Sequence, residues 1–186
     1  MTATRDKLWT VEEYHRIIDA GILTENDKVE LLNGRIVQMS AQTPPHAGTT
    51  QRIDRCLQNL LRDVAEIRTQ LPITLATSEP EPDIAVVRID AGAYGDHHPN
   101  ADEIFLLIEV SYSTLQTDLE EKAPIYARAN IAEYWVLAVA EREAYIFRNP
   151  TPEGYQSEII LQDNAVIAPL AFPEIEIPFS ELFLPS

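Results

Sequence analysis

Cysteine is almost absent from this sequence. Cys56 is the only one among 186 residues, so no disulfide can form within the chain, as is usual for proteins of a reducing compartment. The N-terminal stretch MTATRDKLWT has no apolar run of the kind found in signal peptides. The apolar runs FLLIEV and YWVLAVA have the length of strands and are too short to span a bilayer. We therefore expect a cytoplasmic protein.

Basic residues are also scarce: 14 lysines and arginines stand against 30 aspartates and glutamates, a formal net charge of −16. Nucleic-acid-binding proteins usually carry a basic surface, because neutralising phosphates supplies much of their affinity. This sequence shows no basic excess overall. Its acidic residues can simply keep the surface soluble, and a few of them can converge on a metal ion. The length and the 45% content of hydrophobic residues predict one globular domain over residues 1–186.

The N-terminal part of the chain predicts a helix followed by a β-hairpin. Thr10 and Glu13 have the spacing of a capping box, so a helix should begin there and run to about residue 20. Gly21 is expected to end it in the left-handed region. Residues 28–39 predict the hairpin, because Asn33-Gly34 favours a two-residue turn between two runs that are typical of strands.

A long helix is expected from about His46 to Ile67, after the chain is broken at Pro44-Pro45. Its apolar residues fall on one side, and three arginines fall on another, mixed with acidic side chains. The arginine face can contact phosphates or can be an ordinary solvated face. The apolar set is Ile53, Leu57, Leu60, Leu61 and Val64, and the arginines are Arg52, Arg55 and Arg62.

Strand patterns dominate the rest of the chain. Strands are expected over 69–76, 83–87, 104–110, 134–139, 144–147 and 155–161, with a helix over 118–129. The Pro-rich C-terminal segment is expected to be extended and irregular. This order predicts an α/β protein of the α+β type, with a central mixed sheet flanked by helices.

Three charged residues occupy positions where the pattern calls for apolar ones. Glu109 lies inside the run Phe105–Val110, which should form a buried strand, and a buried carboxylate must be neutralised, paired or bound to metal. Asp83 opens a second apolar strand directly after a proline. Lys122 falls on the inward face of the helix over 118–129, although Pro124 makes the start of that helix less certain.

Two interpretations of these residues are open on the pattern alone. Glu109 and Lys122 can form a buried structural ion pair, with Asp83 merely at the start of a strand. Alternatively, the two carboxylates can hold a magnesium ion, whose shell is completed by water and phosphate oxygens. The metal would lower the pKa of a bound water, and the ammonium of Lys122 would stabilise the phosphate in the transition state.

In their order along the chain, Pro82-Asp83, Glu109 and Lys122 resemble the motif of the PD-(D/E)xK nuclease superfamily. In that superfamily the lysine usually lies two residues after the second acid, where this chain has Ser111. The position of Lys122 on the following helix resembles the migrated lysine of several branches. More narrowly, the chain is similar to a large bacterial family of restriction-endonuclease-like proteins once catalogued as a domain of unknown function. The likeness covers most of the chain and rests on residues 29–39, 45–46, 82–87, 108–114, 118–126 and 132–136.

The resemblance implies a restriction-endonuclease-like fold and an endonuclease that cleaves DNA with Mg²⁺ or Mn²⁺. Asp83 and Glu109 would hold the metal, with the carbonyl of Val110 as another ligand and Glu30 as a further acid. Lys122 would complete the catalytic set. The resemblance also suggests a homodimer, because such folds often pair to cut two strands. Two alternatives remain open: an inactive binding or scaffold protein, favoured by the acidic surface, and a hydrolase for another phosphorylated substrate.

Other polar residues give weaker signals. His46 can assist at the site or hold a loop, and the sequence does not decide between these roles. His97 and His98 form a pair, but no cysteine or acid at ligand spacing accompanies them, which disfavours a zinc site. Ser111 and Ser113 have no evident His–Asp partners for nucleophilic catalysis.

Overall fold

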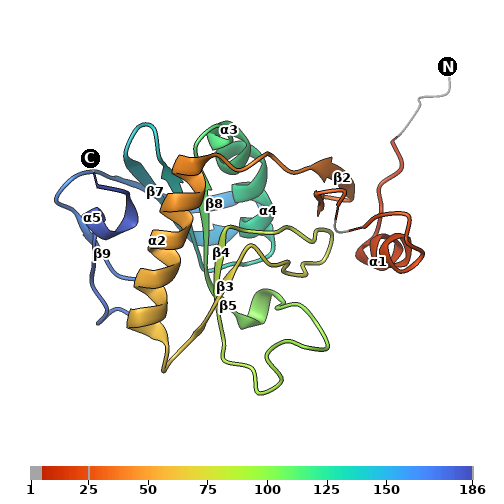
Figure 1. Ribbon diagram of the computed structural model, residues 1–186, viewed down its shortest axis with the longest axis horizontal. Helices are drawn as coiled ribbons and strands as arrows, with labels where there is room; N and C mark the ends of the chain where they lie inside the picture. Colours follow the sequence, from red (N-terminus) through yellow and green to blue (C-terminus); the bar gives the residue numbers. More distant parts are fainter. Residues whose placement is uncertain (1–5, 25, 186) are drawn as a thin grey trace.

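A six-stranded mixed sheet forms the centre of the computed structural model, which describes residues 6–24 and 26–185 (Figure 1). Its strand order is β3-β4-β5-β6-β7-β8. β5 and β6 are parallel, and every other neighbouring pair is antiparallel. The predicted mixed sheet is therefore confirmed. The strands are β3 (Glu66–Thr69), β4 (Ile84–Val87), β5 (Ile104–Ser111), β6 (Glu133–Ala138), β7 (Glu143–Thr151) and β8 (Gly154–Leu161).

The N-terminal helix and the hairpin are both present as predicted. Helix α1 (Val11–Asp19) begins at a capping box, in which Thr10 accepts from the backbone N–H of Glu13 and donates its own backbone N–H to the Glu13 carboxylate. Gly21 follows with φ +69. Strands β1 (Val29–Leu32) and β2 (Arg35–Gln38) form a separate two-stranded sheet. The turn residues Asn33 and Gly34 have φ +48 and +76, as a type I′ turn requires.

The long helix differs from the prediction at both ends. Helix α2 spans Pro44–Leu61, so the two prolines lie inside its first turn, where their missing N–H groups need no partner. The expected extension to Ile67 is wrong, because residues 66–69 pair with β4 as strand β3. The strand predicted over 69–76 is also wrong, because only Thr69 of that range lies in a strand. Of the apolar residues on one side of the expected helix, Ile53, Leu57 and Leu61 are buried, whereas Leu60 and Val64 are exposed.

The sheet has two covered faces, which we name by the helix that packs on each. On the α2 face lie α2 and the C-terminal segment with β9 (Val166–Ile167), β10 (Ile177–Pro178) and α5 (Phe179–Leu182), which the sequence predicted only as irregular. On the α4 face lies α4 (Ala123–Arg128). The helix predicted over 118–129 is thus α4 preceded by two short turns. These are α3 (Leu115–Thr117) and the π-helical segment η2 (Asp118–Lys122); a 3-10 turn, η1 (Ala101–Glu103), precedes β5.

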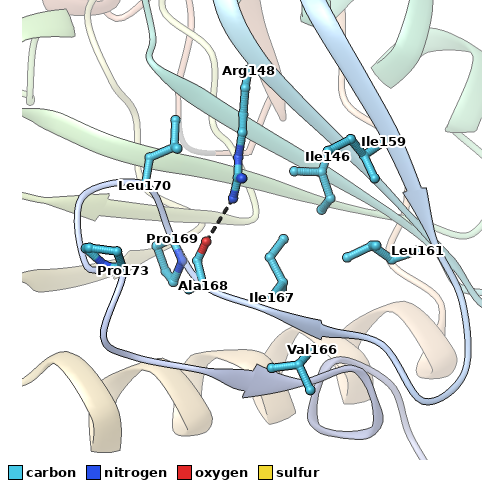
Figure 2. A pocket seen from close by; sticks show the side chains of 10 residues that line it. All are labelled: Ile146, Arg148, Ile159, Leu161, Val166, Ile167, Ala168, Pro169, Leu170 and Pro173. Carbon is cyan, nitrogen blue, oxygen red and sulfur yellow. Dashed lines mark hydrogen bonds between the residues drawn. The ribbon is translucent and has the colours of Figure 1, made fainter.

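On the α2 face, an apolar groove of about 310 Å³ runs between the C-terminal segment and strands β7 and β8 (Figure 2). Arg148 of β7 donates to the carbonyl of Ala168 at 2.8 Å and so ties the C-terminal segment to the sheet. This groove lies on the opposite face from Glu109. Within the described residues, no helix combines the length and apolarity needed to cross a membrane.

Candidate metal centre

Asp83 and Glu109 lie on the same face of the sheet. Ile108 and Val110 of β5 belong to the core on the α2 face, so strand alternation turns Glu109 to the α4 face. Asp83 lies two residues before Ala85, which belongs to the core on the α4 face. The backbone N–H of Asp83 donates to Oε2 of Glu109 at 3.4 Å. The two carboxylates therefore meet where β4 begins beside the end of β5.

The Asp83 carboxylate is held by three donors. Oδ2 accepts from the backbone N–H of Val110 at 2.8 Å and contacts Nε2 of His46 at 3.0 Å, while Oδ1 accepts from Gln70 at 3.1 Å. Burial acts to raise the pKa of Asp83, but the contact with His46 and the other hydrogen bonds outweigh it and lower the pKa. The same contact raises the pKa of His46. Asp83 is therefore an oriented, ionised carboxylate.

The backbone of Val110 faces the same place. Its N–H donates to Asp83 and so points to the side of β5 on which β4 lies. The N–H and C=O of one strand residue point to the same side of the strand, as the paired hydrogen bonds of antiparallel ladders require. The carbonyl of Val110 is therefore directed to the Asp83 side of β5, as a ligand position there needs.

Lys122 points inward, as the helical pattern predicted, and lies among carboxylates. Its Nζ donates to Oε1 of Glu109 at 3.0 Å and lies 3.4 Å from Oε1 of Glu30. Tyr126 also donates to Oε1 of Glu109, at 3.0 Å. Burial acts to lower the pKa of Lys122, but Glu109 and Glu30 outweigh it and raise the pKa, so the ammonium stays charged. Burial raises the pKa of Glu109, which is 3% exposed, and Lys122 offsets this only in part.

Glu30 reaches the cluster from the hairpin. It is buried on β1, and its Oε2 accepts from the backbone N–H of Glu81 at 3.1 Å. Its other oxygen faces Lys122. The hairpin is thus fixed to the central sheet at the site itself, and Glu30, Asp83, Glu109 and Lys122 form one contiguous group.

A π-helical turn brings a further acid that sequence reasoning missed. Asp118, at the start of η2, is buried and accepts from the hydroxyls of Ser111 and Thr114. Burial raises the pKa of Asp118, and Lys122 opposes this. Because Asp118 lies four residues before Lys122, extending the inward helical face by one turn would have found it. Tyr126, which holds Glu109, lies four residues after Lys122 on the same face. Gln70, which holds Asp83, had no comparable signal in the sequence.

The donor set suits a hard divalent cation. No group of three or more His, Cys, Asp or Glu side chains in residues 6–24 and 26–185 is arranged to hold a metal ion by itself. Magnesium, however, is usually bound through one or two carboxylates, with the rest of its shell from water and phosphate. The carboxylates of Asp83 and Glu109 with the Val110 carbonyl match that pattern. Glu30 adds a carboxylate that now faces the Lys122 ammonium.

Other residues singled out from the sequence lie elsewhere. The arginines of α2 belong to a helix on the opposite side of the sheet from Glu109. Among them, Arg52 pairs with Glu181 at 3.0 Å. Only the first turn of α2, with His46, reaches the candidate centre. His97 lies in a loop beside Asp96, and the hydroxyl of Ser111 is bound to Asp118.

Comparison with known proteins gives one family and a similar structure. The model of the Uma2 family, described as "Putative restriction endonuclease", matches residues 11–180. A crystal structure described as a "putative nuclease belonging to DUF820", from Anabaena variabilis ATCC 29413, is similar with a TM-score of 0.76. The match has 17% identity and covers 94% of this chain and 97% of that chain, a likeness that shows the fold. The predicted restriction-endonuclease-like fold is thereby confirmed. No curated protein matches the chain.

Proposed function

Because this chain belongs to the Uma2 family, described as "Putative restriction endonuclease", we propose that it is a metal-dependent endonuclease that hydrolyses phosphodiester bonds of DNA. One observation carries the proposal: Asp83 and Glu109 meet on one sheet face, with the Lys122 ammonium 3.0 Å from Glu109. Two carboxylates that can hold a metal beside a fixed cation suit attack on a phosphodiester, whose transition state gathers negative charge.

In this proposal Asp83, Glu109 and the carbonyl of Val110 hold Mg²⁺ or Mn²⁺, and Glu30 serves as a further ligand or as an acid bridged through water. When bound, the cation supplies a more acidic water and neutralises charge on the phosphate. His46 has a positioning role, because its Nε2 contacts the Asp83 oxygen that also accepts from Val110.

Lys122 acts as a hydrogen-bond donor. Burial acts to lower its pKa, but the surrounding carboxylates outweigh it and raise the pKa, which favours the charged ammonium. Its ammonium can instead donate to a phosphate oxygen and orient the water, which stabilises charge that develops in the transition state. The ion pair with Glu109 holds the side chain ready for that role.

The test is cleavage of plasmid, linear and single-stranded DNA with Mg²⁺ or Mn²⁺. Asp83→Asn and Lys122→Met should each lower the rate by about a hundredfold or more, because each removes an electrostatic contribution to the transition state. Asp63→Asn is the matched control, since its side chain is 92% exposed. EDTA should abolish cleavage, and isothermal titration should show that Asp83→Asn weakens metal binding.

The proposal would be contradicted if the wild-type protein cut no DNA and bound no metal. Metal binding without DNA cleavage would favour a hydrolase for another phosphorylated substrate, which small phosphodiester and phosphomonoester substrates then test. Neither binding nor cleavage would favour a scaffold role, which the net charge of −16 supports.

We also propose that the chain acts as one domain and as a cytoplasmic homodimer, because cutting two strands calls for two centres. Light scattering after gel filtration should then give twice the mass of the 21.0 kDa chain. A monomeric mass at working concentration would contradict the dimer and leave the centre itself unaffected.

A further inference from the structure

Arg68 of β3 is a buried cation without a hydrogen-bond or ion-pair partner among the described residues. Only 8% of the residue is exposed, and its Nε is enclosed without a hydrogen bond. Its guanidinium lies over the ring of Tyr94, with Cζ 5.1 Å from the ring centroid. No ion pair joins it to any acid in residues 6–24 and 26–185, although the chain has 30 acids. Buried charges are normally paired, so Arg68 needs an explanation.

His98 has an unpartnered polar atom of its own, because its Nδ1 is enclosed without a hydrogen-bond partner among the described residues. Burial lowers the pKa of His98, and the nearby Arg68 lowers it further, while Glu79 opposes both. The segment that carries His98 is fixed by the hydrogen bond from Thr74 N–H to the carbonyl of Pro99, at 2.9 Å. His98 therefore lies on a fixed segment within the electrostatic field of Arg68, and burial favours its neutral form.

Three of the acids around this pair are engaged elsewhere. Asp90 accepts from the backbone N–H groups of Gly92 and Tyr94, and Glu103 accepts from Asn100. Glu79 contacts His15 at 2.7 Å and accepts from the Thr74 hydroxyl at 2.8 Å. Glu66, two residues before Arg68 on β3, forms no ion pair with it either, so the guanidinium of Arg68 keeps donors for a ligand.

The pair lies on the same sheet face as the candidate metal centre. Arg68 pairs with Ala85 across β3 and β4, and Asp83 lies two residues before Ala85. At the usual strand dimensions, the Cα atoms of Arg68 and Asp83 are about 8 Å apart. Gln70, which lies two residues after Arg68, donates to Asp83. A nucleic-acid strand on this face can therefore pass from the metal centre to Arg68.

We propose that Arg68 and His98 bind a backbone phosphate of the nucleic-acid substrate, next to the phosphate at the metal centre. The inference rests on the proposed nuclease function and adds a substrate contact to it. A guanidinium offers a planar set of donors that matches phosphate oxygens, and the Nδ1–H tautomer of His98 adds another donor. The phosphate would supply the counter-charge that Arg68 lacks in the protein.

The first measurement is binding of a labelled single-stranded 12-mer DNA by fluorescence anisotropy. It uses Mg²⁺ and a Lys122→Met background, so that binding is measured without turnover. Arg68→Gln should weaken binding about tenfold, and His98→Asn should weaken it less, because Arg68 brings a full positive charge to the phosphate whereas His98 brings a neutral donor. Arg68→Gln should also lower the dependence of log affinity on log salt by about 0.7, the value for one phosphate contact.

Arg62→Gln is the matched control, because it makes the same charge change at a side chain that is 77% exposed. It should leave both the affinity and the salt dependence within twofold of the background. Should Arg68→Gln fail to fold, His98→Asn and Arg68→Lys carry the same comparison, since Arg68→Lys keeps the charge but loses the planar donor set.

Thermal unfolding with inorganic phosphate, at constant ionic strength and with EDTA, separates the two sources of the anion. At ten times its dissociation constant, phosphate should raise the Tm of the wild type by about 3 °C and that of Arg68→Gln not at all. A phosphate effect without any change in DNA binding would show a free-anion site and overturn the substrate contact. Unchanged DNA binding and no phosphate effect would overturn the site altogether, whatever the cleavage assay shows.

Discussion

Glu109 of β5 and Glu133 of β6 are both buried, but the groups that contact their carboxylates differ. Glu133 of β6 is fully buried, and Oε1 accepts from Arg148 at 2.8 Å and from Trp135 at 3.0 Å. Its Oε2 accepts from the backbone N–H of Leu170 at 2.7 Å. Glu109 instead shares one lysine with further carboxylates, and burial raises its pKa. Glu133 has the contacts of a structural ion pair, whereas Glu109 lies in a cluster with an excess of acid.

Removing Arg148 should therefore be costly. Arg148→Met leaves Glu133 buried without its cation, which should lower the free energy of unfolding by about 3 to 5 kcal/mol. For a chain of this length we expect Tm to fall by roughly 10 °C, measured by thermal unfolding at neutral pH. Arg62→Met, at an exposed position, should change Tm by little. The double variant Arg148→Met/Glu133→Gln should recover most of the loss, and no recovery would show that the loss came from packing alone.

For single residues, the sequence predicts which charged side chains belong to the centre better than it predicts the residues that contact them. Asp83, Glu109 and Lys122 are visible because charges interrupt apolar patterns, and the structure brings all three together. Glu30 emerged only through the family resemblance, because an acid on a hairpin strand looks solvent-facing by itself. Gln70 gave no signal, because its contact with Asp83 depends on the register of β3, which sequence patterns place poorly.

Among the elements, the β1–β2 hairpin links the N-terminal part to the candidate centre. Gly34 accepts from the backbone N–H of Trp9 at 2.7 Å and donates to the carbonyl of Thr77 at 2.9 Å. A Cβ on Gly34 would lie 2.9 Å from the Trp9 carbonyl oxygen and 3.0 Å from the Cβ of Leu8. The turn therefore needs glycine both for its φ of +76 and for this close approach.

Gly34→Ala should destabilise the chain more than Gly21→Ala. Both glycines have positive φ, so each substitution costs about 1 to 2 kcal/mol of backbone strain. A Cβ on Gly21 meets no atom within 4 Å, so only Gly34→Ala adds a clash. We expect urea denaturation to show an extra loss of at least about 1 kcal/mol for Gly34→Ala. If Glu30 acts at the centre, DNA cleavage by Gly34→Ala should also fall, while Gly21→Ala cleaves normally; equal losses in both variants would contradict this account.

Element boundaries show where sequence patterns lose information. The capping box of α1 and the Asn33-Gly34 turn were predicted correctly, because both depend on a few local residues. The end of α2 was not, because helical periodicity continues past Leu61 while the pairing of β3 with β4 decides the fold there. The π-helical turn of η2 had no sequence signal, although the inward position of Lys122 was still predicted.

At the scale of the whole molecule, the acidic balance and the candidate substrate oppose each other. The net charge of −16 repels a polyanion at long range, while Lys122 and Arg68 are local cations on the α4 face. These effects have different ranges, because salt screens distant exposed charges strongly and buried pairs much less. The net charge should therefore govern how fast DNA arrives, and the buried cations how it is held.

Salt should consequently speed DNA cleavage at low ionic strength. The screening length falls from about 30 Å at 0.01 M to about 8 Å at 0.15 M, so long-range repulsion fades over this interval. We expect kcat/KM for DNA to rise at least about threefold, against the fall that is usual for basic DNA-binding proteins. Asp63→Lys with Glu153→Lys tests the cause. Both residues are exposed, and each substitution replaces a negative charge by a positive one, which takes the net charge from −16 to −12. This double variant should cleave faster at 0.01 M and respond less to salt. A steady fall of kcat/KM with salt in the wild type would instead show that local phosphate contacts dominate even the approach of DNA.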